Sequence, residues 1–155
     1  MIEAHPFAHP YAVRLIDELQ AEYRLRYGSP DETLIDVGEF DPPAGLFLIG
    51  LLDGDPVAAG GWRRLGPGLG EVKRMYVAAR ARGRGFARLM LAELESTMAA
   101  AGYDRVVLMT GALQPEAMAL YESSGYAPSG AYGLYADYSD ARFYGKPLAL
   151  GVSRE

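Results

Sequence analysis

Apolar residues recur every four positions in two segments of the chain, as they do on the buried face of a helix. The first segment runs from Pro10 to about Tyr27 and contains Tyr11, Leu15, Leu19 and Tyr23. The second runs from Arg84 to Ala101 and contains Phe86, Met90, Leu94 and Met98. Each is followed by a glycine, Gly28 or Gly102, where helices commonly end. Shorter helices are predicted over Glu32–Val37 and from Pro115 to Ser124.

Apolar or partly alternating runs between turn residues predict the strands. They are Leu46–Leu52, Val57–Leu65, Glu71–Val77, Arg105–Met109 and Ala141–Leu148. Asp53-Gly54-Asp55 joins the first two as a hairpin turn, and Gly66-Pro67-Gly68 leads into the third. The order of elements predicts one α/β (or α+β) domain over residues 1–155, in which helices flank a central mixed, mostly antiparallel sheet.

The composition narrows the chemistry and the partners. The 155 residues are 50% apolar and 23% charged, the balance of a folded globular domain. The sequence contains no cysteine, which excludes disulfides, thiolate metal sites and a cysteine nucleophile. His5 and His9 are isolated from other metal-ligand residues, so no metal is expected. The chain has neither a long apolar run nor a signal-peptide pattern, so we expect a cytoplasmic protein that does not bind membranes.

The positive charges are concentrated in one segment. The net charge is −5, yet six of the 15 basic residues lie between Lys73 and Arg88, and no acid occurs there. An acidic protein with one local cationic patch favours a small anionic ligand at that place over a nucleic-acid partner.

The loop before the second long helix is the most informative stretch. Gly83 and Gly85 permit close approach of the backbone to a ligand, and the N–H groups at a helix start bind phosphate or pyrophosphate. Arg82, Arg84 and Arg88 add full charges nearby. The alternative is an ordinary strand-to-helix turn with solvated arginines. Neither the Rossmann spacing nor the P-loop spacing of glycines is present.

Two motifs in the correct order resemble the GNAT superfamily of N-acetyltransferases. Arg82-x-x-Gly85-x-Ala87 is similar to the family's Arg/Gln-x-x-Gly-x-Gly/Ala signature, and the segment Gln114 to Tyr126 resembles its second block, Ala-x-x-Leu-Tyr-x-x-x-Gly-Phe/Tyr. The closing Phe143–Leu148 resembles the family's last strand. The likeness covers roughly Leu46 to Leu148, and it departs from the family at Ala79, where a proline is usual, and at Gln114, where asparagine is frequent.

The resemblance implies a GNAT-like fold and acetyl-CoA as cosubstrate. It implies that the backbone of β-strand residues Met75, Tyr76 and Val77 pairs with the pantetheine arm, which Gln114 would also contact. It implies that the pyrophosphate is held by the N–H groups of Arg82, Gly83, Arg84, Gly85, Phe86, Ala87 and Arg88. Tyr121 would be the general acid toward the leaving thiolate; the alternative is a tyrosine that only packs in the core.

Without a cysteine, direct attack of a primary amine within a ternary complex is the expected route. Such an amine is mostly protonated at neutral pH, since its pKa is about 10, so a base would help. Glu71 is the candidate base, because it lies on the strand that would hold the cofactor; the alternative is a Glu71–Lys73 ion pair on the strand surface.

The acceptor is predicted only as a class, a small-molecule or peptide amine. Residues that would flank the acceptor in such a fold are Trp62, Tyr132, Tyr135, Tyr138, Tyr144, Asp137 and Asp140. Aromatics and carboxylates suit a cationic amine, although most of these tyrosines are expected to pack against strands. The alternative function is a non-catalytic sensor of acetyl-CoA or CoA. A homodimer is compatible with the family resemblance.

Overall fold

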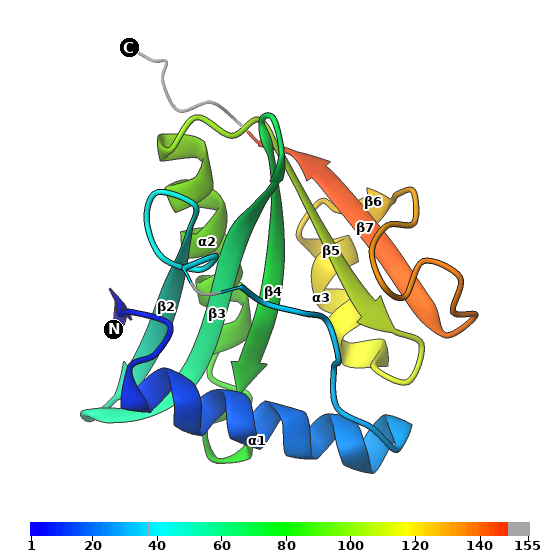
Figure 1. The fold of residues 1–155 in the computed structure, drawn as a ribbon. Coiled ribbons are helices and arrows are strands. Elements are labelled where there is room, and N and C mark those ends of the chain that lie inside the picture. The colour runs from blue at the N-terminus through cyan, green and yellow to red at the C-terminus, as the bar shows by residue number, and fades with distance from the viewer. Residues whose placement is uncertain (37, 149–155) are drawn as a thin grey trace.

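The computed structural model describes residues 1–36 and 38–148, in which one mixed sheet is covered by helices (Figure 1). The helices are α1 (Pro10–Tyr27), η1 (Ala79–Ala81), α2 (Phe86–Ala100) and α3 (Pro115–Ser123). The strands are β1 (Ile2–Ala4), β2 (Gly45–Leu52), β3 (Asp55–Gly66), β4 (Leu69–Val77), β5 (Arg105–Gly111), β6 (Ala127–Pro128) and β7 (Ala141–Pro147). None of the described helices is long and apolar enough to cross a membrane.

The sheet has the order β1-β2-β3-β4-β5-β7-β6, and only the β4–β5 pair is parallel. One face packs against α2 and α3 around a core that includes Met90, Leu94 and Leu108. The other face packs against α1, where Leu15 meets the side chain of Phe47 and its neighbours. Alternate residues of β2 thus point to opposite layers, as the pleat of a strand requires. The predicted α/β class and mixed sheet are confirmed.

The sheet opens where β4 and β5 run side by side. Their parallel pairing extends only from Leu69–Arg105 to Val72–Leu108. On its other side, β4 contains a bulge: Lys73 pairs with Gly61 and Tyr76 with Ala59, so β4 has one residue more than β3 over this stretch. A bulge bends its strand, and the second half of β4 is therefore free of β5 at the edge that faces it.

Two of the predicted helices differ from the structure, and local backbone contacts explain both differences. The helix predicted from Arg84 begins at Phe86, because Gly85 has a φ of 83° and forms a left-handed N-cap. The helix predicted over Glu32–Val37 is wrong in its described part, which is non-helical. There the backbone of Asp31 is bound by the Gln20 side chain, and the Asp31 carboxylate accepts the backbone N–H of Thr33. These bonds hold the chain in a turn.

Candidate active site

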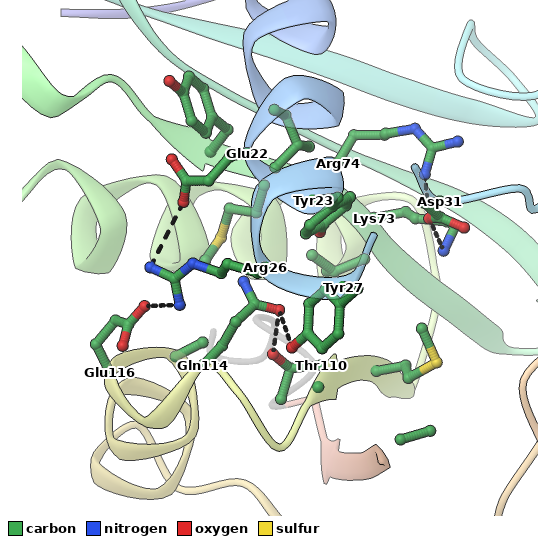
Figure 2. A pocket seen from close by; sticks show the side chains of 18 of the residues that line it. Glu22, Tyr23, Arg26, Tyr27, Asp31, Lys73, Arg74, Thr110, Gln114 and Glu116 are labelled. Carbon is green, nitrogen blue, oxygen red and sulfur yellow. Dashed lines mark hydrogen bonds and ion pairs between the residues drawn. The ribbon is translucent and has the colours of Figure 1, made fainter. Parts of the chain in front are cut away.

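A pocket of about 730 Å³ lies where β4 and β5 separate. The second half of α1 forms one wall, the separated strands form the floor, and the start of α3 closes another side (Figure 2). The residues β4 contributes to the wall run from Val72 to Val77, so the bulge lies inside the pocket. The separation of the strands is therefore what creates the cavity.

One end of the pocket holds a buried cluster of three charges. The Asp31 carboxylate accepts Lys73 Nζ at 2.7 Å and also binds the Arg74 guanidinium. Burial by itself would raise the pKa of Asp31, but the positive charges of Lys73 and Arg74 outweigh burial and hold this pKa well below its usual range. The exposed fraction of all three side chains is 8% or less. The cluster is thus a fixed charged group inside the protein.

The other end of the pocket is crossed by a chain of ion pairs. Arg26 of α1 binds Glu116 of α3 at 2.8 Å and lies 3.7 Å from Glu22 (Figure 2). Glu22 in turn binds Arg82 at 2.6 Å, and Arg82 Nε donates to the Val77 carbonyl. This chain connects α1, the loop after β4 and α3, so it fixes the relative positions of the three walls.

Tyr23 and Tyr27 of α1 lie between these two ends (Figure 2). The Tyr27 hydroxyl and the Thr110 hydroxyl both donate to the Gln114 side-chain oxygen, at 3.3 Å and 3.2 Å. Gln114, predicted from the second motif, is thereby held at the junction of α1, β5 and α3. Burial raises the pKa of Tyr23, so this side chain stays a neutral aromatic wall.

Tyr121 of α3 is buried and lines the pocket. Its ring packs against Tyr126 and Tyr144, with centroid separations of 5.9 Å and 6.0 Å. No hydrogen bond from its hydroxyl is found among the described residues, and no deeply buried side-chain oxygen there lacks a partner, so the hydroxyl reaches the pocket that Tyr121 lines. Burial raises its pKa to about 12, which keeps the proton on the hydroxyl at neutral pH.

Nine of the eleven predicted cofactor residues fall into two neighbouring groups. Six of them line the pocket: Met75, Tyr76, Val77, Arg82, Ala87 and Gln114. Gly83, Arg84 and Gly85 lie exposed in the loop just outside it. Phe86 is buried in the core, and Arg88 donates to the hydroxyls of Ser123 and Ser124 at the end of α3.

Glu71 lies outside the main pocket. It is buried, with Oε1 accepting from Arg63 at 3.0 Å and Oε2 accepting the Tyr132 hydroxyl at 3.1 Å. The alternative to the base role, a Glu71–Lys73 pair on the strand surface, is wrong in its partner. Arg63 is the direct cross-strand neighbour of Glu71, whereas Lys73 reaches Asp31. Both oxygens of Glu71 are therefore occupied by protein donors.

The predicted acceptor residues divide between pocket and packing. Tyr135, Tyr138 and Asp140 line the pocket. Trp62 donates to Thr97, and Tyr144 donates to Glu122, so both have partners in other elements. Asp137 is exposed and lies outside both cavities described.

The charged cluster and the α1 wall were missed by the sequence-based reasoning. Tyr23 was interpreted as part of the apolar stripe of a helix, and Asp31 fell just before the helix that does not form. The run of basic residues beginning at Lys73 was the one available signal, and it was assigned to the loop that follows. Among the described residues no group of His, Asp or Glu could hold a metal ion.

Residues 12–126 match the model of the acetyltransferase (GNAT) family, and the chain belongs to this family; it is an acetyltransferase. Among its relatives, an IAA acetyltransferase from Azospirillum brasilense is 34% identical over 137 residues, covering 88% of this chain and 90% of that protein.

Solved structures of related proteins share the fold. One from Klebsiella pneumoniae, named as an acyl-CoA N-acyltransferase, has a TM-score of 0.83 at 26% identity, covering 96% of this chain and 97% of the other. A phosphinothricin acetyltransferase from Sinorhizobium meliloti, solved with AcCoA, has a TM-score of 0.69 at 17% identity, covering 100% and 91%.

Proposed function

We propose that the protein is an acetyl-CoA-dependent N-acetyltransferase that transfers the acetyl group directly to a primary amine of a small molecule or peptide. The observation that carries this proposal is the convergence of three features on one pocket. They are the open edge of β4, the glycine-containing start of α2, and a buried tyrosine whose hydroxyl has no protein partner among the described residues.

The loop before α2 fits a pyrophosphate. Gly83 and Gly85 have positive φ values of 81° and 83°, and a Cβ added to either would meet nothing within 4 Å. Their backbone therefore borders open space. The first N–H groups of α2 have no partner within the helix, so they and the positive end of the helix dipole favour an anion here.

The exposed edge of β4 fits an extended pantetheine arm. Met75, Tyr76 and Val77 lie beyond the last β4–β5 pair, so their backbone groups on this side are not used by β5. An amide-containing chain in this gap would pair with them as an added strand does. Arg82 is bonded to the Val77 carbonyl and to Glu22, so we expect this side chain to exchange partners when the cosubstrate enters.

Tyr121 is suited to the departure of the thiolate. In the proposed reaction the amine nitrogen forms a bond to the thioester carbonyl carbon and gives up a proton to a base in the pocket. The carbon–sulfur bond breaks, and the thiolate takes a proton from the Tyr121 hydroxyl. Because its pKa is about 12, the Tyr121 hydroxyl stays protonated through the neutral range and is available as a donor when negative charge develops on the sulfur. The hydroxyl regains its proton from solvent after the products leave.

Two carboxylates compete for the role of base. Glu71 was the sequence-based candidate, but its contacts to Arg63 and Tyr132 favour the role of a buried ion pair. Asp140 lines the pocket, and no ion pair of its side chain is found among the described residues. We expect Asp140→Asn to lower kcat with little effect on stability, and Glu71→Gln to act mainly on stability. The reverse pattern would assign the base to Glu71.

Calorimetric titration with acetyl-CoA, with CoA, NADH and ATP as comparisons, tests the cosubstrate. Selective binding of acetyl-CoA and CoA, followed by amine-dependent thiol release, would support the enzyme. Binding without any thiol release across an amine panel would favour a non-catalytic sensor, although membership of an acetyltransferase family favours turnover. Absence of CoA binding would refute the proposal.

A further inference from the structure

At the Asp31 end of the pocket, two buried cations bind one carboxylate. Lys73 and Arg74 are both buried, with side chains 8% and 5% exposed, and both bind the same oxygen of Asp31. The second Asp31 oxygen is occupied by the Thr33 backbone and hydroxyl. Two buried cations therefore share a single carboxylate, and no second carboxylate lies within ion-pair distance of either one among the described residues. Buried charges are normally paired.

Arg74 also has unused donors. Only one of its nitrogens, Nη1, has a partner in the described part of the protein, and that partner is Asp31. No deeply buried side-chain nitrogen there lacks a hydrogen bond, so the remaining guanidinium N–H groups reach accessible space. Arg74 and Lys73 both line the pocket, so their positive charge lies at this end of it.

The backbone of β4 brings the two cations together. Neighbouring residues of a regular strand point to opposite faces, so Lys73 and Arg74 would normally diverge. Arg74 instead has a φ of 57° in the bulge, and both side chains meet at Asp31. The left-handed region is costly for a residue with a side chain, and such strain is found mostly at functional sites.

We propose that the amine acceptor carries an oxyanion, such as a carboxylate, which binds Lys73 and Arg74 as the missing counter-ion. This inference rests on the proposed N-acetyltransferase activity. The cluster lies at the end of the pocket opposite the Glu22–Arg26–Glu116 chain, with Tyr23 and Tyr27 between (Figure 2). The loop that fits the pyrophosphate follows Arg82, a member of that chain, so the two anion sites are separate.

The aromatic walls indicate the rest of the acceptor. Tyr23, Tyr27, Tyr135 and Tyr138 line the pocket beside the cluster. An acceptor that bridges from the cations to Tyr121 would cover these rings with its body. The predicted substrate class is a compact amine with an apolar or aromatic body and an oxyanion, of the kind that amino acids represent.

A panel of matched amines tests this inference. The probes are free amino acids with aliphatic and aromatic side chains, their carboxamides, 2-aminoethylphosphonate, and spermidine as a purely cationic amine. Thiol release from acetyl-CoA is measured, with kcat/KM expressed per free-base amine. We expect at least a tenfold preference for an amino acid over its own carboxamide. Turnover of the phosphonate but not the carboxylates would identify a phosphate-like group as the oxyanion.

Lys73→Met is the informative variant. It leaves Asp31 and Arg74 as a neutral pair, so the local contacts persist while the excess charge disappears. We expect the acid-over-amide preference to fall about tenfold, through a raised KM for the acidic amine. Lys146→Met is the matched control, because Lys146 is ion-paired to Glu95 at 2.8 Å and does not line the pocket. It should keep the wild-type preference.

Failure of the inference and failure of the enzyme assignment can be told apart by titrating acetyl-CoA first. If acetyl-CoA does not bind, the proposed function is refuted. If acetyl-CoA binds but only neutral or cationic amines react, the oxyanion inference alone is overturned. If acetyl-CoA binds and none of the panel reacts, both the oxyanion inference and the enzyme assignment are overturned. An unchanged preference in Lys73→Met would overturn it as well.

Discussion

Removing the shared carboxylate should cost far more stability than removing one of the two cations it binds. Asp31→Asn leaves Lys73 and Arg74 buried side by side with no counter-ion, and breaking a buried pair in this way typically costs about 3–5 kcal/mol. Lys73→Met leaves one cation opposite one anion and adds apolar surface, which is typically close to neutral. We expect its cost to stay below about 1 kcal/mol.

Urea denaturation of the two variants and the wild type at pH 7 measures the difference between these two stability costs. A difference of about 3 kcal/mol corresponds to roughly 6–12 °C in melting temperature for a domain of this size. The Asp31 pKa is depressed in the folded state. The stability it supplies is therefore complete above the ordinary carboxyl pKa of about 4 and is lost as the pH falls below that value.

The difference in unfolding free energy between the wild type and Asp31→Asn should accordingly become smaller at acidic pH. Equal costs for Asp31→Asn and Lys73→Met would refute the reasoning, because they would mean that the two cations do not depend on one carboxylate. A gap that does not change on acidification would contradict the assignment of the effect to the Asp31 charge.

Three further predictions concern the tyrosine and the core. Tyr121→Phe should lower kcat by about 10²–10⁴-fold in a thiol-release assay, with little change in the urea midpoint, because the hydroxyl has no hydrogen bond among the described residues. Retention of more than half of the activity would contradict the acid role. Since burial raises the pKa of Tyr121 from 10.0 to about 12, the wild type should lose up to about 2 kcal/mol of stability as the pH rises across that interval, and Tyr121→Phe should lose less. In Gly61→Ala, the new Cβ would lie 2.6 Å from the Phe40 ring and 2.7 Å from the Phe47 ring, and overpacking of this kind costs about 1–3 kcal/mol in urea denaturation. An unchanged midpoint would show that the rings relax freely.

The elements that the sequence predicts well are those fixed by local periodicity. The four-residue spacing from Phe86 to Met98 corresponds to one buried helix face, and every member of that set is buried against the sheet. The β1 and β6 strands, of three and two residues, are too short to show any alternation. They form because neighbouring strands offer backbone hydrogen-bond partners. Those partners are distant in sequence, so the local pattern of residues does not predict them.

The ion-pair partner of Glu71 could have been predicted from the sequence, whereas the charged cluster could not. Arg63 and Glu71 are equidistant from Pro67, the middle of the Gly66–Gly68 turn, so a tight hairpin would place them opposite one another as observed. The contact from Asp31 to Lys73, by contrast, joins residues far apart in sequence. It depends on how the segment after α1 returns across the sheet, and on a bulge that sequence spacing does not reveal.

In the proposed function, the bulge in β4 would serve both the cosubstrate and the acceptor. It releases the strand edge that fits the pantetheine arm, and it turns Arg74 toward Asp31 in a conformation that an arginine adopts at a cost of about 1 kcal/mol. Glycine adopts this conformation without strain, and its use would leave Lys73 and Asp31 as a neutral pair. Arg74→Gly should therefore unfold at the same urea concentration as the wild type or a higher one, while its preference for acidic amines falls. A large loss of stability would show that the guanidinium holds the fold together, whereas a stable variant that no longer distinguishes acid from amide would show that the strain is retained for substrate recognition.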